Sequence, residues 1–261
     1  MDNFQVLSFT TDYGLSDGFV AACHGVAATR APRLRVIDVS HDVPPGDVRR
    51  GATIMAQTLP YLPRGVHVGV VDPGVGTSRR PVAVEAVDGV LVGPDNGLLL
   101  WAAAALGGAR RAVALSNADL HRHPTSHTFH GRDVFTPAAA ALASGTPFSD
   151  AGDPVAVADL TRLPEPAVEA DEDGVRAEVL GVDRFGNVQL AADGAALDPL
   201  GEDLEVAGRA AVRGDMFAAA APGELVVLVD SAGKVAVAVN NGSAAETLGL
   251  RAGDRVAISR R

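Results

Sequence analysis

The segment VDPGVGTSRR, residues 71–80, places an acid and two arginines on either side of two glycines. Glycines followed by basic residues suggest a phosphate-binding loop, but the segment has no lysine and neither a GxxxxGK[ST] nor a GxGxxG pattern. Asp72 and Arg79 stand seven residues apart across the turn. A carboxylate and a guanidinium that face one another would hold a polar ligand or a water between opposite charges.

Other acids also follow predicted strands. Asp12, Asp42, Asp72 and Asp95 each close or closely follow an apolar, β-branched run. In open α/β sheets, ligands bind beyond the carboxyl ends of the strands. Asp17 lies five residues after Asp12 and would point into the same crevice, where paired carboxylates bind a ribose diol or a cationic amine. Taken singly, each aspartate is better explained as a turn former or a helix cap, but the four together favour a site.

A histidine-rich loop, HRHPTSHTFHGRD, contains His121, His123, His127 and His130. Imidazole is the commonest zinc ligand, so a metal site is one interpretation of this loop. The spacing matches neither HExxH nor CxxC, which favours a polar surface loop before a helix. His130 is closest to the predicted helix and is therefore best placed to reach the crevice.

The first part of the chain alternates strands with helices. Strands are predicted over 6–12, 35–42 and 65–72, with two more within 82–96, and helices over 16–31, 46–59, 98–108 and 132–145. Ser16 is the expected N-cap of the first helix. This order predicts a Rossmann-like α/β/α domain, in which helices cover both faces of a mostly parallel sheet.

The pattern changes after Gly145. Residues 148–174 are rich in proline and acids, and short strands with glycine turns follow them. These strands predict a smaller C-terminal antiparallel β-barrel. The expected organisation is an α/β domain over 1–160, a linker over 161–173 and a barrel over 174–261.

Composition limits the class of ligand. A formal net charge of −10 over 261 residues disfavours nucleic acid as a partner, because phosphates require a basic face. The single cysteine, Cys23, allows no internal disulfide and favours a reducing compartment. The sequence shows neither a signal-peptide pattern nor an apolar run of the ~20 residues that a membrane helix needs. We therefore expect a cytoplasmic protein that acts on a small molecule and does not bind a membrane.

Five motifs occur in one order along the chain: TTDYGLSDG, VDPGVGTSRR, GPDNGLL, TFHGRDVF and VDRFGNV. Together they resemble the S-adenosylmethionine hydroxide adenosyltransferase family, the hydrolase relative of the S-adenosylmethionine-dependent fluorinase and chlorinase. The resemblance extends from about residue 6 to residue 258.

The resemblance implies a reaction. Hydroxide derived from water attacks the 5′ carbon of S-adenosylmethionine, methionine leaves and adenosine forms. Bulk water has a pKa of about 15.7, so the difficulty lies in making the nucleophile. The family motif assigns this task to Asp72, Arg79 and His130, with Arg79 chosen over Arg80 for its spacing from the aspartate. Either Asp72 or His130 would accept the proton of the water.

The resemblance also implies the substrate contacts. Asp12 matches the residue that binds the ribose hydroxyls, and Asp17 and Asp183 match residues near the methionine amine. The remaining contacts are Ser231 near the methionine carboxylate and an adenine segment made of Phe185, Asn187 and the chain from Val239. Phe185 and Asn187 are also open to simpler readings, as a barrel core residue and a turn residue. The family works as a homotrimer with the site between subunits, and it requires neither a cofactor nor a metal.

Three alternatives remain open. A halogenase is disfavoured because Asp72 would repel halide and because His130-Gly131 replaces the halide-binding residues. A non-catalytic binding protein for adenosine or S-adenosylmethionine is suggested by Gly46, which stands where the family usually has a large apolar residue facing the ligand. Tyr13 or Leu15 would then have to fill that wall of the pocket. A metal-dependent hydrolase using the histidine loop is the third alternative.

Overall fold

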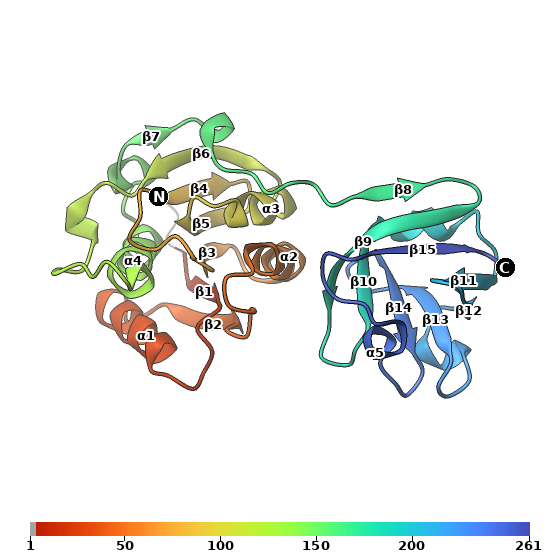
Figure 1. Ribbon diagram of the computed structural model, residues 1–261. Coiled ribbons are helices and arrows are strands. Elements are labelled where there is room, and N and C mark those ends of the chain that lie inside the picture. The colour runs from red at the N-terminus through yellow and green to blue at the C-terminus, as the bar shows by residue number, and fades with distance from the viewer. Residues whose placement is uncertain (1–3) are drawn as a thin grey trace. The chain divides into compact units, whose positions relative to one another are not determined.

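The computed structural model describes residues 4–261. The chain folds as two compact units, the first ending at Leu163 and the second beginning at Pro164 (Figure 1). The first unit contains a seven-stranded sheet with four main helices, and the second contains a β-barrel. The predicted fold class is therefore confirmed.

The sheet of the first unit has the strand order β2-β1-β3-β5-β4-β6-β7. Its strands are β1 Val6–Thr11, β2 Arg35–Ser40, β3 Gly65–Val70, β4 Pro81–Ala86, β5 Gly89–Pro94, β6 Ala109–Ala114 and β7 Pro154–Val155. The first four in this order are parallel, and β4, β6 and β7 join in antiparallel pairs. The β4–β5 hairpin turns at Val87-Asp88, between the paired residues Ala86 and Gly89. The parallel half brings the carboxyl ends of β1, β2, β3 and β5 to one edge of the sheet.

Helices cover both faces of this sheet. They are α1 Phe19–Arg30, α2 Val48–Thr58, α3 Leu98–Ala105 and α4 Thr136–Ala143, with a π-helix over Gly131–Phe135 leading into α4. Helices α1 and α4 pack together on one face, and α2 and α3 pack together on the other (Figure 1). Two apolar cores therefore enclose the central strands, whose side chains are buried on both faces.

Local details differ from the predictions. Ser16 is not the N-cap of α1, because the helix begins at Phe19 and Gly18 occupies the cap position without a side-chain bond. Asp47 caps α2 by accepting from the Arg50 amide at 2.9 Å. Strand β6 was not predicted, since its sequence ARRAVA lacks a run of β-branched residues.

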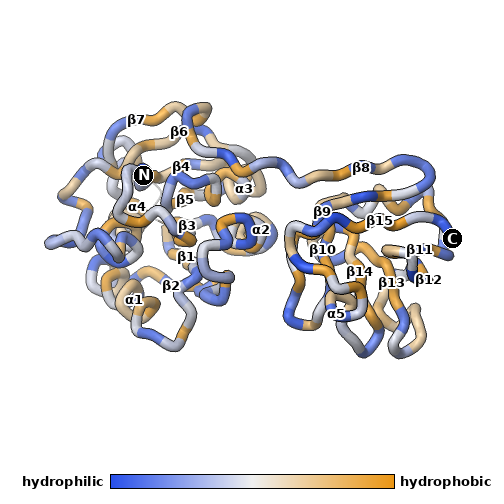
Figure 2. Tube along the Cα trace, in the orientation of Figure 1, coloured by the Kyte–Doolittle hydropathy of each residue, from blue (hydrophilic) through white to orange (hydrophobic). Residues whose placement is uncertain are grey.

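The second unit is a closed barrel of seven strands. They are β9 Gly174–Val182, β10 Val188–Asp193, β11 Asp203–Val206, β12 Arg209–Arg213, β13 Leu225–Val229, β14 Lys234–Val239 and β15 Arg255–Arg260. The β9–β10 pairing closes the barrel, and all neighbours are antiparallel except β12 and β13, which are parallel. Apolar residues dominate β13 and β14 in Figure 2. Alternate residues of these strands line the barrel core, and those between them form a second, smaller apolar cluster with Ala220.

Short elements complete the chain. Strand β8, Val168–Ala170, pairs with β9 inside the segment that the sequence predicts as a linker, and α5 spans Ala244–Leu248. Short 3₁₀ turns cover Leu59–Tyr61, Ala118–Leu120, Phe148–Ala151, Val157–Asp159, Gly194–Leu197 and Phe217–Ala219. Over residues 4–261, none of the helices combines the length and the apolar character needed to span a membrane.

Candidate active site

The loop after β3 folds back on itself. The Val75 amide donates to the Asp72 carbonyl at 3.2 Å, and the Thr77 amide donates to the Gly74 carbonyl at 3.1 Å. These two turns return the chain to its starting point. As a result, Arg79 Nε donates to both carboxylate oxygens of Asp72 at 3.0 and 3.1 Å, and Arg79 Nη2 donates to Oδ2 at 2.5 Å.

His130 completes the cluster from a distant part of the chain. Arg79 Nη2 lies 2.8 Å from His130 Nδ1. Arginine only donates, so Nδ1 must accept, and neutral His130 then carries its proton on Nε2. The two loops approach closely because Gly76 has no side chain: a Cβ there would lie 2.4 Å from the His127 carbonyl oxygen.

The cluster is largely withdrawn from solvent. The side chains of Asp72 and Arg79 are 5% and 10% exposed, and the guanidinium lies 5.1 Å from the centre of the Phe135 ring. Arg79 Nη1 is buried and meets no acceptor within the described part of the chain. Burial and the neighbouring Arg79 charge hold the pKa of His130 below its ordinary value. The arrangement thus offers an unused N–H donor beside a carboxylate and a neutral imidazole.

The second arginine has a different partner. Arg80 donates to Asp95 Oδ2 at 2.9 and 2.6 Å and to the Asp159 carbonyl at 2.6 Å. Asp95 also accepts from the Thr161 amide at 2.8 Å. Asp95 is therefore part of a tether between β5 and the 159–161 segment, and Arg79 is the arginine that faces Asp72.

Asp133 holds the histidine loop in place. It is fully buried, pairs with Arg132 at 2.7 Å and with Arg122 at 3.4 Å, and accepts from the Ser126 amide at 2.9 Å. Burial alone would raise the pKa of this carboxyl, but the hydrogen bonds from Arg132 and Ser126 hold it below its usual value. This network ties together residues 122, 126, 132 and 133 of the loop from which His130 comes.

Tyr13 is a site residue that sequence reasoning considered only as a possible pocket wall. Its hydroxyl stands 2.0 Å from where a Cβ on Gly131 would lie, so it occupies the space that the glycine leaves beside His130. Its ring contacts Phe19 and Phe129. Burial raises the pKa of Tyr13, and the nearby charges of Asp12 and Asp72 act in the same direction, so the phenol stays neutral.

The remaining strand-end acids differ in their surroundings. Asp12 directly follows β1, and its Oδ2 accepts from the Gly46 amide at 2.9 Å. Gly46 has φ +75°, a left-handed conformation that favours glycine. Asp17 and Asp42 are exposed. The Gly46 amide thus holds the Asp12 side chain. Gly46 therefore has a structural role of its own, in addition to replacing the large apolar residue that the family usually has there.

The loop histidines do not converge. Within residues 4–261, the one group of three ligand side chains close enough to share an ion is His24, Asp38 and His41, none of which belongs to the loop. His123 is exposed and contacts the Ala118 carbonyl at 2.9 Å.

In the second unit, Asp183 organises the turn between β9 and β10. Its Oδ1 accepts from the amides of Phe185 and Asn187 at 2.8 and 2.9 Å, and its Oδ2 accepts from Asn187 Nδ2 at 2.8 Å. Phe185 is 77% exposed, so it is not barrel core. The turn also packs on α5, because the Gly186 carbonyl accepts from the Ala245 amide at 3.0 Å.

Ser231 and Val239 lie at opposite ends of β14. Ser231 is an exposed residue of the β13–β14 turn, whereas Val239 ends β14 with its side chain in the barrel core. Since β10 and β14 pair from Val188↔Val237 to Asp193↔Lys234, the Asp183 turn lies at the Val239 end. At about 3.3 Å per residue, β14 separates the two ends by roughly 17 Å.

Comparison with known families identifies the chain. The model of the SAM hydroxide adenosyltransferase N-terminal domain matches residues 7–152, and that of the C-terminal domain matches residues 177–257. The chain belongs to the SAM hydroxide adenosyltransferase family. Its family relatives include the (R)-S-adenosyl-L-methionine hydrolase of Salinispora tropica, 62% identical over 97% of both chains. The protein of the same name from Thermus thermophilus is 45% identical over 94% of this chain and 96% of its own.

More distant relatives of this chain include a fluorinase of an Actinoplanes species, 25% identical over 98% of this chain and 97% of its own. Among solved structures, a conserved protein of Thermotoga maritima matches with a TM-score of 0.88 and 34% identity, covering 97% of this chain and 100% of its own. A conserved protein of Thermus thermophilus matches with a TM-score of 0.80 and 41% identity, covering 98% and 100%.

Proposed function

We propose that the protein hydrolyses S-adenosyl-L-methionine to adenosine and L-methionine, through attack of a water-derived hydroxide on the ribose 5′ carbon. The observation that carries the proposal is the cluster of Asp72, Arg79 and His130, in which a carboxylate, a guanidinium and an imidazole meet largely away from solvent. Relatives at 62% identity that are named as hydrolases of this substrate support it.

In this mechanism the attacking water lies beside the Asp72–Arg79 pair, and the Arg79 guanidinium stabilises the negative charge that develops on the water oxygen. Asp72 accepts the proton of the water. His130 is the weaker candidate for that role, because its Nδ1 accepts from Arg79 and a proton placed there would set two cations in contact. The hydrogen bonds that the Asp72 carboxylate receives from the described residues all come from Arg79, which leaves lone pairs for the water.

The sulfonium makes methionine a neutral leaving group, so no acid has to protonate it. The residues that bind the substrate are proposed from the family motifs. Asp12 binds the ribose hydroxyls, Asp17 binds near the amine and Ser231 binds the carboxylate. Asp183, which the motif also places near the amine, lies at the other end of β14 from Ser231 and holds the Phe185–Asn187 turn of the adenine segment instead. The adenine segment comprises Phe185, Asn187 and the chain at Val239. Phe185 presents an exposed ring for stacking on the base.

The relatives' names specify one configuration at the sulfonium, (R). We extend this preference to the present chain. An equal mixture of the (R) and (S) epimers tests it: chromatography should show loss of the (R) epimer and persistence of the (S) epimer. Equal consumption of both would refute the preference without refuting hydrolysis.

The reaction itself is tested in water enriched in oxygen-18. Attack at the 5′ carbon places the label in adenosine and leaves methionine unlabelled, which mass spectrometry distinguishes. Asp72→Asn should still bind substrate in calorimetry but form little adenosine. Tight binding without turnover by the unmodified protein would instead support the non-catalytic alternative.

The halogenase alternative retains one supporting observation, the fluorinase relatives at 25–27% identity. The Asp72 carboxylate beside Arg79 opposes it, because an anion at the nucleophile position would repel halide. Reaction in excess chloride or fluoride should therefore yield adenosine and no 5′-halogenated nucleoside.

The assembly and its setting are part of the proposal. We propose a cytoplasmic homotrimer in which two copies of the chain share each site, and a reaction that needs no cofactor or metal. Light scattering measures the assembly. Mixing inactive Asp72→Asn chains with Phe185→Ala chains should restore part of the activity. In the mixture, a site that takes its first unit from a Phe185→Ala chain and its second unit from an Asp72→Asn chain carries neither change.

A further inference from the structure

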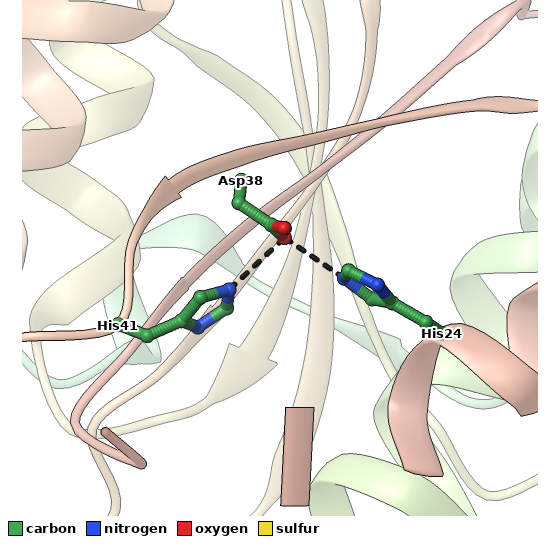
Figure 3. Close-up of side chains that lie close together, drawn as sticks. All are labelled: His24, Asp38 and His41. Atoms are coloured by element: carbon green, nitrogen blue, oxygen red, sulfur yellow. Dashed lines mark hydrogen bonds and ion pairs between the residues drawn. The ribbon is translucent and has the colours of Figure 1, made fainter. Parts of the chain in front are cut away.

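Three potential metal ligands meet outside the Asp72–Arg79–His130 cluster. His24 comes from α1, Asp38 from β2, and His41 from the segment just after β2 (Figure 3). The Nε2 atoms of both histidines lie 2.9 Å from the same carboxylate oxygen, Asp38 Oδ1. All three ligand atoms lie within 4.8 Å of one another.

Hydrogen bonding does not fully account for this arrangement. His24 Nε2 is placed to hydrogen-bond with Asp38, but His41 Nε2 is buried and makes no hydrogen bond to the described residues, despite its short distance from the same oxygen. The His41 side chain is only 4% exposed. Two ligands of a tetrahedral zinc ion, each about 2.0–2.1 Å from the metal, lie about 3.3 Å apart. The observed 2.9 Å separations therefore need to widen by only a few tenths of an ångström.

The surroundings of His41 suit a metal ligand. Its Nδ1 lies 2.8 Å from Thr11 Oγ1, and that hydroxyl also accepts from the Tyr13 amide at 3.2 Å. A hydroxyl that accepts from Nδ1–H fixes the tautomer in which the Nε2 lone pair is free to bind a cation. His24 and Asp38 are 34% and 42% exposed, which gives an ion a route to the site.

We propose that His24, Asp38 and His41 bind a divalent transition-metal ion of the zinc type, with solvent in the fourth position. Two imidazoles and one carboxylate suit Zn²⁺ and its neighbours, whereas Ca²⁺ and Mg²⁺ require oxygen ligands. The ion takes no part in the hydrolysis. It joins α1 to β2 and to the segment that runs from His41 to Gly46, whose amide holds Asp12.

The test uses the full chain after chelator treatment, titrated with Zn²⁺ in a calorimeter and with Co²⁺ in a visible spectrophotometer. The unmodified protein should bind one ion per chain, and saturating Zn²⁺ should raise Tm by about 5 °C. His24→Gln and Asp38→Asn remove partly exposed ligands and should weaken binding more than about 100-fold. Thr11→Ala should weaken it by roughly 10-fold, as expected for a group that orients a ligand.

His123→Gln is the matched control, because it removes an exposed imidazole from the histidine loop and should leave binding unchanged. Circular dichroism of His24→Gln verifies that the variant is folded. Unchanged Zn²⁺ affinity in folded His24→Gln would overturn the proposal, as would loss of binding in His123→Gln or an absence of Zn²⁺ binding to the unmodified protein.

Discussion

The hydroxyl of Tyr13 occupies the position beside Gly131 that any side chain there would need, 2.0 Å from an ideal Cβ. The Tyr13 ring is confined by Phe19 and Phe129, so it has little room to withdraw. The residue after His130 is therefore limited to glycine by a residue more than a hundred positions earlier in the chain.

Gly131→Ala should lower the free energy of unfolding by about 1–3 kcal/mol, because it overpacks this contact, and should also lower kcat by displacing His130. Gly25→Ala is the control, since a Cβ at that helical position meets nothing within 4 Å. In a Tyr13→Phe background the cost of Gly131→Ala should shrink. If the losses in free energy of unfolding caused by Gly131→Ala and Tyr13→Phe were additive in chemical denaturation, the contact between these two residues would not be the cause of the destabilisation.

Arg79→Lys should reduce kcat by about 100-fold or more, because lysine cannot bridge Asp72 and His130 while donating to the attacking water. Arg80→Lys should leave kcat near the unmodified value and only lower Tm, since Arg80 tethers Asp95 and Asp159. Steady-state rates of adenosine formation compare the two. Equal losses of kcat would contradict the assignment of Arg79.

The lowered pKa of His130 predicts the shape of the pH profile. If neutral His130 is required to accept from Arg79, kcat/KM stays level near pH 7 and falls as the pH drops through a value below the ordinary 6.5. His130→Asn should lack this acid limb, whereas His123→Gln should retain it. An acid limb centred above 6.5 would be inconsistent with this role.

His67 predicts loss of stability in acid. It is buried in β3 beside Ser8, and burial lowers its pKa from 6.5 to about 4. Between these values the unfolded chain binds a proton that the folded chain does not, so the free energy of unfolding falls as pH decreases, by up to about 3 kcal/mol. Urea denaturation from pH 7 to 4 measures the change, and His67→Gln should flatten it relative to His123→Gln.

Much of the fold follows from local sequence. The β-branched runs predict β1, β2 and β3, and the glycine turns predict the barrel strands. Strand β6 is missed because its extended conformation depends on hydrogen bonding to its neighbours β4 and β7 rather than on its own composition. The cap of α1 is missed because Ser16 lies in a turn that ends before the helix begins.

The candidate site is only partly visible in the sequence. The spacing of Asp72 and Arg79 predicts their pairing, because the turns between them are local. The contact of Arg79 with His130 joins residues 51 positions apart, and family motifs alone suggest it. The Tyr13–Gly131 contact and the meeting of His24 with Asp38 and His41 leave no local signal, since each depends on how separate elements pack.

The Asp183 turn has a consequence for the energetics of recognition. The Asp183 carboxylate accepts from the backbone amides of Phe185 and Asn187, which fixes the backbone of the turn while the Phe185 ring remains in solvent. The loss of backbone entropy at this turn is therefore incurred when the chain folds, not when a planar ligand arrives. A planar ligand should therefore bind to this turn more tightly than to a flexible loop that makes the same contacts.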